Sequence, residues 1–100
     1  MKNANSPIIE YRPLFNRQRK LAPLAIKVAF REALELFLDD PDHPSLRNHL
    51  LRNKFSGFGS INVNEDWRAL FKIRKTKTQT VITFYLLGTH KQLYKSQAES

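Results

Sequence analysis

The sequence predicts an α+β fold, in which a small, mostly antiparallel sheet carries helices packed on one face. Polar and apolar residues alternate through 60–64 and again through 67–74, which indicates a hairpin. Apolar residues recur at helical spacing over 23–38, and a β-branched and aromatic run over 80–87 indicates a further strand. Helices followed by consecutive strands with short connections are typical of the α+β class.

The N-terminal part of the chain is expected to contribute one strand and a basic helix. Residues 1–6 read as a polar, flexible tail, and 7–12 as a short strand that pairs with a strand from much later in the sequence. Residues 14–20 follow as a short helix or turn with a cationic surface.

The clearest single element is the helix predicted over 23–38. Pro23 suits its first turn, where the missing N–H is no loss. Ile26, Phe30 and Phe37 fall on one face, and burying them against a sheet contributes roughly 2 kcal/mol each before ordering costs. We therefore interpret this helix as part of the core. A shorter helical turn that includes His49 is expected over 44–51.

The C-terminal half is expected to form three consecutive antiparallel strands within 57–87. The alternation places Trp67, Ala69, Phe71 and Ile73 on the buried face of the second strand. The third strand is predicted to stop at Gly88. A final turn over 89–94 and a flexible tail over 96–100 complete a single domain of 100 residues.

Composition limits the possible partners and the compartment. Seventeen Lys and Arg stand against nine Asp and Glu, a formal net charge of +8. This balance indicates a polyanionic partner or an acidic protein that covers the charge. The chain has no cysteine, and no apolar run is long enough to span a bilayer. We expect a cytoplasmic protein without membrane contact.

Several side chains have the chemistry of a nuclease site. Histidine transfers protons near neutral pH, cationic groups hold phosphate oxygens, and an aromatic ring stacks on a base. The candidates are His49, Lys54, Asp66, Arg68, His90 and Tyr94.

Each candidate also has a purely structural interpretation. His49 is equally suited to capping or packing its helical turn. Asp66 is equally suited to a turn, and Arg68 to a solvated row of charges along a strand. His90 would be an ordinary loop histidine, and Tyr94 an anchor for the tail. A metal site combining histidines with Asp66 has no ligand-spaced motif behind it, so none is expected.

Taken together, six short segments resemble the RelE superfamily of bacterial toxins, and within it the YafQ-like branch. The resemblance extends from Tyr11 to Lys95, and the Gly-Thr-His and Leu-Tyr segments near the end are its most distinctive part. The segments are His49-Leu50, Gly57-Phe58, Ser60-Ile61, Asp66-Trp67-Arg68, Gly88-Thr89-His90 and Leu93-Tyr94.

The resemblance implies a RelE-like fold and the toxin of a type II toxin–antitoxin system. Such toxins cleave mRNA in the ribosomal A site without a metal or other cofactor. The implied partners are a cognate acidic antitoxin, the ribosome and mRNA, with DNA reached only through the antitoxin.

The family's chemistry is attack of a ribose 2′-OH on the adjacent phosphate, which needs a base, an acid and cations. By resemblance, His90 is the general acid, and His49 and Asp66 share the role of base or of orienting the substrate. Tyr94 matches the aromatic residue that stacks on an mRNA base. Arg68 is assigned to phosphate from its charge and position, with Lys54 beside the glycine turn as a further cation.

Two positions depart from the YafQ-like pattern and leave other functions open. Asn62 stands where the pattern has a histidine, and Leu86 stands where it has an arginine. Arg68 or Lys54 would then supply the missing charge, or catalysis is weakened. One alternative is a ParE-like toxin, which binds DNA gyrase and does not need two histidines for proton transfer. The other is a homologue that mainly binds its antitoxin.

Overall fold

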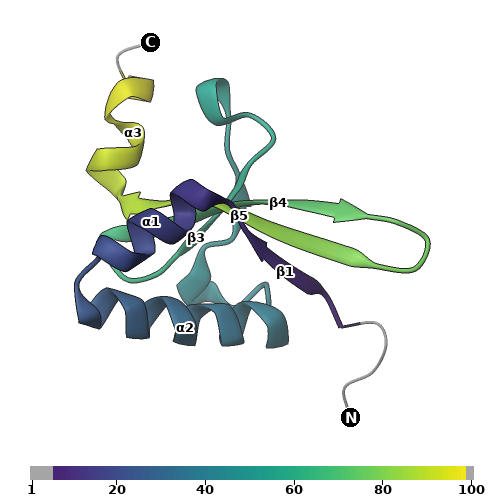
Figure 1. Ribbon diagram of the computed structural model, residues 1–100. Coiled ribbons are helices and arrows are strands. Elements are labelled where there is room, and N and C mark those ends of the chain that lie inside the picture. The colour runs from purple at the N-terminus through teal and green to yellow at the C-terminus, as the bar shows by residue number, and fades with distance from the viewer. Residues whose placement is uncertain (1–5, 99–100) are drawn as a thin grey trace.

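A computed structural model describes residues 6–98 and contains a five-stranded sheet with strand order β1-β5-β4-β3-β2. The strands are β1 (Ile8–Tyr11), β2 (His49–Leu50), β3 (Gly59–Asn62), β4 (Trp67–Lys75) and β5 (Thr80–Thr89). The three consecutive antiparallel strands predicted from the alternation are confirmed as β3, β4 and β5. β1 lies parallel to β5, so it pairs with a late strand, as predicted (Figure 1).

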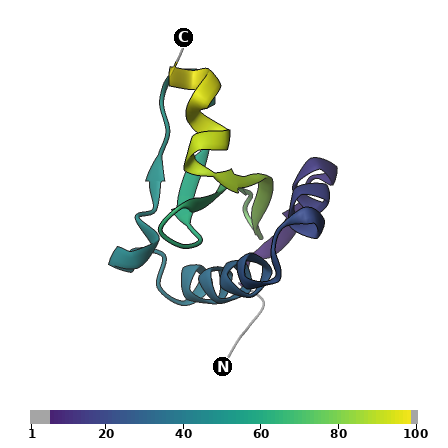
Figure 2. The ribbon, with the colours of Figure 1, turned by 90° about the vertical axis from the view of Figure 1, so that its left-hand side faces the viewer.

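Two long helices cover one face of the sheet. They are α1 (Pro13–Leu21) and α2 (Leu24–Asp39), and each begins close to a proline, which needs no N–H partner there. A third helix, α3 (His90–Ala98), rises on the opposite side of the sheet from α2, and the two views agree on this (Figures 1 and 2). None of the helices within residues 6–98 has the length and apolar character needed to cross a membrane.

The core forms where α1 and α2 meet the sheet. Ile26, Phe30 and Phe37 are buried, as the helical spacing predicts. The Phe30 ring meets Phe84 of β5 edge-on with 5.3 Å between centroids, and the Phe37 ring lies 5.0 Å from Phe71 of β4. Aromatic pairs at these distances add to the stabilisation from burial alone. α2 is therefore fixed to the central strands by rings, and Trp67 packs at the edge of the same cluster.

The structure corrects three sequence predictions. The helical turn expected over 44–51 is only a 3₁₀ turn, η1 (Pro44–Leu46), and His49 belongs to β2. The final turn expected over 89–94 is the start of α3, which continues into the segment read as a tail. Ile73 is 48% exposed, because the β4–β5 hairpin extends past the helices (Figure 1). Residues 1–5 and 99–100 of the two expected tails lie outside the described part.

One residue of β5 has no partner in β4. Leu70 pairs with Leu86 and Phe71 pairs with Phe84, so Tyr85 is the extra residue of a β-bulge. Phe84 belongs to the core, whereas Leu70 is buried outside that cluster on the other side of the sheet. We call the sheet surface turned away from α1 and α2, which carries Ser60, Leu70 and Tyr85, the second face.

Candidate active site

His90 lies at the junction of β5 and α3, where a capping box starts the helix. The Thr89 hydroxyl accepts from the Gln92 N–H at 3.0 Å, and the Gln92 side chain accepts from the Thr89 N–H at 2.9 Å. This reciprocal pair satisfies backbone donors that a helix start leaves open. The Thr89–Gln92 spacing is the sequence signal for α3 that the predicted turn overlooked. It fixes His90 as the first residue of the helix, with its side chain exposed.

Asp66 is held beside His90 by the backbone. The His90 N–H donates to the Asp66 carbonyl at 2.7 Å, which joins the β3–β4 turn to the start of α3. Within the turn, the Asn64 side chain accepts from the N–H groups of Asp66 and Trp67 at 2.8 and 2.7 Å. This Asx-type arrangement agrees with the structural interpretation of Asp66 as a turn residue. The Asp66 side chain itself is exposed.

His49 sits in β2 directly opposite Ser60 of β3. Its Nδ1 lies 2.6 Å from the Arg47 carbonyl oxygen. A carbonyl only accepts, so Nδ1 must carry the proton, and in the neutral ring Nε2 then keeps its lone pair. Arg47 adopts a left-handed backbone, with φ of 45°, to aim that carbonyl at the ring. The arrangement leaves His49 able to accept a proton at Nε2.

In His43, by contrast with His49, Nδ1 is the hydrogen-bond acceptor, so the two histidines differ in their roles. Its Nδ1 accepts from the Ser45 N–H at 3.2 Å, so His43 caps the 3₁₀ turn η1. Among residues 6–98, no group of three His, Asp or Glu side chains gathers in a way that would hold a metal ion.

Tyr94 connects the two ends of the site. Its ring lies 4.6 Å from the His90 ring, and its hydroxyl donates to the hydroxyl of the fully buried Ser60 at 3.3 Å. Residues directly opposite in antiparallel strands point to the same side of a sheet, so His49 shares the second face with Ser60. Strand pairing thus places His49 opposite Ser60, and side-chain contacts run from Ser60 through Tyr94 to His90. Ser60 was not among the predicted site residues, because a serine in an alternating strand carries no distinctive signal.

The two cationic candidates lie at the borders of this surface. Arg68 is half-buried, and its guanidinium donates to the carbonyls of Asn64 at 2.9 Å, Trp67 at 3.0 Å and Glu65 at 3.2 Å. These three hydrogen bonds therefore hold the turn that carries Asp66 in place. Lys54 is exposed on the 3₁₀ turn η2 (Asn53–Phe55), whose Phe55 ring meets Tyr94 edge-on at 6.0 Å.

Of the departures from the family pattern, Leu86 falls on the second face, and Asn62 ends β3, where it also lines a pocket beside α2. Asn62 pairs with Arg68, and Leu86 pairs with Leu70, and both are half-buried. No proton donor or cation exists at these two positions. The cations near these positions are Arg68, which pairs with Asn62, and Lys72 and Arg12, which lie against the ring of Tyr85 next to Leu86.

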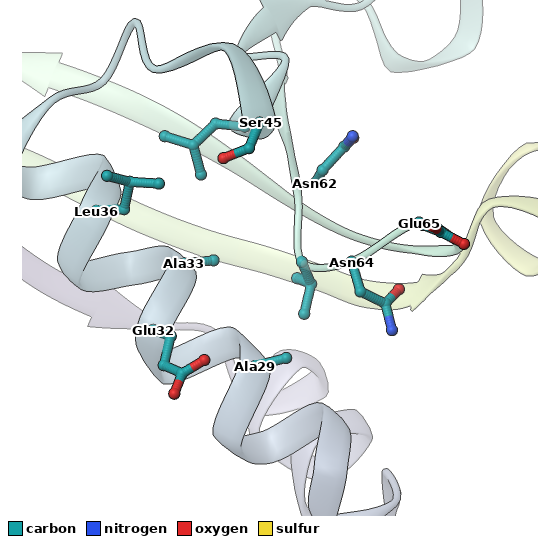
Figure 3. Close-up of a pocket in the computed structure, with 10 residues that line it drawn as sticks. Ala29, Glu32, Ala33, Leu36, Ser45, Asn62, Asn64 and Glu65 are labelled. Atoms are coloured by element: carbon teal, nitrogen blue, oxygen red, sulfur yellow. The ribbon is translucent and has the colours of Figure 1, made fainter.

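A pocket of about 370 Å³ lies on the other side of β3, and it does not contain the histidines. It opens between α2, η1 and the β3–β4 turn, with Ala29, Glu32 and Leu36 on the helix and Asn64 and Glu65 on the turn (Figure 3). Two glutamates, Glu32 and Glu65, line it and would repel a polyanion. The side chains of His49, Asp66 and His90 are instead exposed, which suits a long substrate that lies on the surface.

Comparisons with known proteins place the fold. No protein-family model matches the chain, and no curated protein matches it. The structure of YafQ from E. coli strain BL21(DE3) is 23% identical, has a TM-score of 0.70 and covers 88% of this chain and 98% of its own. The toxin in the E. coli DinJ–YafQ toxin–antitoxin complex is 22% identical, with a TM-score of 0.68 over 89% of this chain and 98% of that chain.

A more distant structure shows the same arrangement. The YoeB/ParE toxin from Agrobacterium tumefaciens is 7% identical, yet has a TM-score of 0.69 over 83% of this chain and 98% of its own. Its likeness therefore lies in the backbone and not in the side chains. From the sheet topology and these matches, the chain has the RelE-like fold of the YafQ and YoeB/ParE toxins.

Proposed function

We propose that the chain is the toxin of a type II toxin–antitoxin system and acts as a ribosome-dependent mRNA endonuclease. The observation that carries this proposal is the placement of His49, with Nε2 available, on the second face opposite Ser60, which Tyr94 links to His90. The RelE-like fold and the +8 charge support it. Action on the ribosome implies a cytoplasmic site of action.

The proposed chemistry uses the chain's own side chains and needs no metal. Nε2 of His49 takes the proton from a ribose 2′-OH, and the 2′-oxygen forms a bond to the adjacent phosphorus. The bond from phosphorus to the 5′-oxygen breaks, and His90 donates a proton to that leaving oxygen. The products are a 2′,3′-cyclic phosphate and a free 5′-OH. Asp66 orients the substrate or shares the role of base.

The remaining candidates bind the substrate. Tyr94 offers a ring to a base next to the cleaved bond, and Lys54 and Arg68 stabilise negative charge that develops on the phosphate. Because Arg68 also holds the β3–β4 turn, its removal is expected to disturb Asp66 as well as the phosphate. An acidic antitoxin would silence the toxin by covering this surface, and an antitoxin is present in the DinJ–YafQ complex.

Primer extension on cellular mRNA after induction tests the proposal. The wild-type chain is expected to produce new 5′ ends within codons and to arrest growth, while His90→Ala abolishes both. Ribosome binding should survive in His90→Ala, because the acid acts on charge that develops only in the transition state. Arg31→Ala, an exposed change on α2, is the matched control and should remain active.

A ParE-like function is the second candidate, because a structure named as a YoeB/ParE toxin has the same fold. Asn62 and Leu86 also weaken the expected catalytic set. If His90→Ala stays fully toxic and purified protein inhibits DNA gyrase, the nuclease proposal is wrong and this function replaces it. If neither cleavage nor gyrase inhibition occurs while an antitoxin still binds, the chain is a homologue that mainly binds its antitoxin.

A further inference from the structure

Aromatic rings continue across the second face well beyond Tyr94. Phe55 meets Tyr94 at 6.0 Å, Phe58 meets Phe55 at 6.0 Å, and Tyr85 meets Phe58 at 5.1 Å, each pair nearly edge-on. All four rings are half-buried, so each keeps part of its surface in solvent. We call Tyr94, Phe55, Phe58 and Tyr85 the ring row. It leads from the candidate active site toward the middle of β5.

Two cations lie on the far half of the ring row. The Lys72 ammonium is 4.5 Å from the centre of the Phe58 ring and 5.4 Å from that of Tyr85. The Arg12 guanidinium is 5.6 Å from the Tyr85 ring. Both side chains are exposed, unlike Arg19, which is half-buried against Tyr11 on the helix side. Cationic side chains and aromatic rings thus lie next to one another on this part of the second face.

The β-bulge explains how Tyr85 reaches this position. In a regular strand, successive side chains alternate between faces, so Tyr85 and Leu86 would point in opposite directions. With Tyr85 as the extra residue, Leu86 pairs with Leu70 and Tyr85 contacts Phe58 and Lys72, so both lie on the second face. Bulges occur next to active sites, where they re-aim a side chain.

We propose that the far half of the ring row, Phe58 and Tyr85 with Lys72 and Arg12, is a binding site for single-stranded RNA outside the catalytic residues. Lys72 and Arg12, which lie over these rings in the free protein, turn to the phosphates of the RNA, and the bases that those phosphates join stack on the two rings. The identification of RNA as the ligand rests on the proposed function. It would hold the nucleotides of an mRNA that lie beyond the base on Tyr94.

One carboxylate sets the limit of this binding site. Glu10 of β1 accepts a hydrogen bond from the Thr83 hydroxyl at 3.3 Å, and Thr83 is paired with Lys72. A phosphate would be repelled at Glu10, so the RNA is expected to run between Tyr94 and Tyr85 and not across the β1 edge. Glu10→Gln should therefore strengthen RNA binding modestly.

Direct binding of an uncleavable probe tests the proposal. The probe is a fluorescein-labelled RNA of about ten nucleotides with 2′-O-methyl riboses, a length within the range of single-strand binding sites. Tyr85→Leu and Phe58→Leu keep apolar bulk but remove the ring face, and each is expected to weaken binding by about 5- to 50-fold. Tyr85→Phe keeps the ring and should bind nearly as the wild type does.

Salt dependence separates the cations from the rings. Lys72→Gln should lower the slope of log affinity against log salt by about 0.7, the contribution of one phosphate contact to a single strand. Tyr85→Leu should lower the affinity without changing this slope. Arg31→Gln, which removes an exposed cation from α2, is the charge-matched control and should change neither quantity appreciably. A duplex of the same sequence should bind more weakly, because its bases are already stacked.

The outcomes distinguish this proposal from the proposed function. Unchanged affinity in Tyr85→Leu and Lys72→Gln overturns the RNA site, even if mRNA is cleaved in cells. Weakened binding in these variants supports the site, even if primer extension finds no cleavage and the nuclease function fails. If poly-L-glutamate displaces the probe as effectively as unlabelled RNA does, the surface recognises charge alone. That result would overturn the proposal and favour an acidic protein as the occupant.

Discussion

His49 shows how one backbone conformation can decide the chemistry of a side chain. Arg47 adopts a left-handed conformation that costs a non-glycine residue about 1–2 kcal/mol. In return, its carbonyl lies 2.6 Å from Nδ1 of His49 and selects the tautomer with a free Nε2. Neither feature has a sequence signal, because nothing in Arg47-Asn48-His49 distinguishes this turn from the helical turn predicted there. The two possible roles of His49 could therefore not be separated from sequence.

His49→Asn is expected to lower the rate of mRNA cleavage about 10²–10⁴-fold, the usual contribution of a general base. The asparagine amide keeps a donor near the position of Nδ1, so β2 should stay in place while the proton acceptor is lost. Single-turnover cleavage on isolated ribosomes measures the effect. A rate close to that of the wild type would show that Asp66 is the base, and Asp66→Asn is the companion variant to compare.

At the scale of elements, sequence pattern predicts long elements well and short ones poorly. α2 carries its own periodicity through Ile26, Phe30 and Phe37, so it was predicted within one residue at each end. β2 consists of two residues and exists only because His49 and Leu50 find β3 in space. The bulge at Tyr85 likewise depends on how β4 and β5 are paired, which alternation in one strand cannot reveal.

The close packing of β3 on β4 makes Gly59 a stability determinant. A Cβ placed on Gly59 would lie 2.4 Å from the Phe71 ring, which is itself packed against Phe37. Gly59→Ala should therefore destabilise the fold by about 1–3 kcal/mol, as overpacking of a core does. Urea unfolding followed by circular dichroism measures this cost.

A double-mutant cycle checks the cause of that destabilisation. Adding Phe71→Leu makes room for the new methyl group, so the double variant should lose less stability than the two single changes added together. Ser56→Ala, an exposed change nearby, should stay within about 0.5 kcal/mol of the wild type. Simple additivity in the cycle would show that the ring does not cause the effect.

At the scale of the whole molecule, some cationic side chains hold the fold together, whereas others are exposed and can meet a partner. Arg19 lies 4.3 Å from the Tyr11 ring and donates to Asn16, and Arg68 holds a turn, so both serve the fold. Lys72, Lys75 and Lys77 are exposed along the β4–β5 hairpin. Composition predicted a polyanionic or acidic partner, but only the fold distinguishes the cations that can meet it.

We expect an acidic antitoxin to associate at a rate that falls steeply as salt increases, because the +8 charge steers the encounter. On the proposed function, an antitoxin at a concentration 100 times its dissociation constant should stabilise the chain by about 2.7 kcal/mol. Stopped-flow association at several salt concentrations and thermal unfolding measure the two effects. An association rate that does not respond to salt would show that the charge serves another partner.

The position of β5 between β1 and β4 also determines when the molecule can finish folding. Glu10 and Thr83 lie next to each other in the sheet although 73 residues separate them along the chain. Contacts this distant close slowly, and during synthesis β1 has no neighbour until β5 has left the ribosome. His90 follows β5 at once, so the sheet and the proposed general acid become available together. On the proposed function, a nascent chain interrupted before residue 80 has neither, and the cell that makes it is not exposed to a partly folded nuclease.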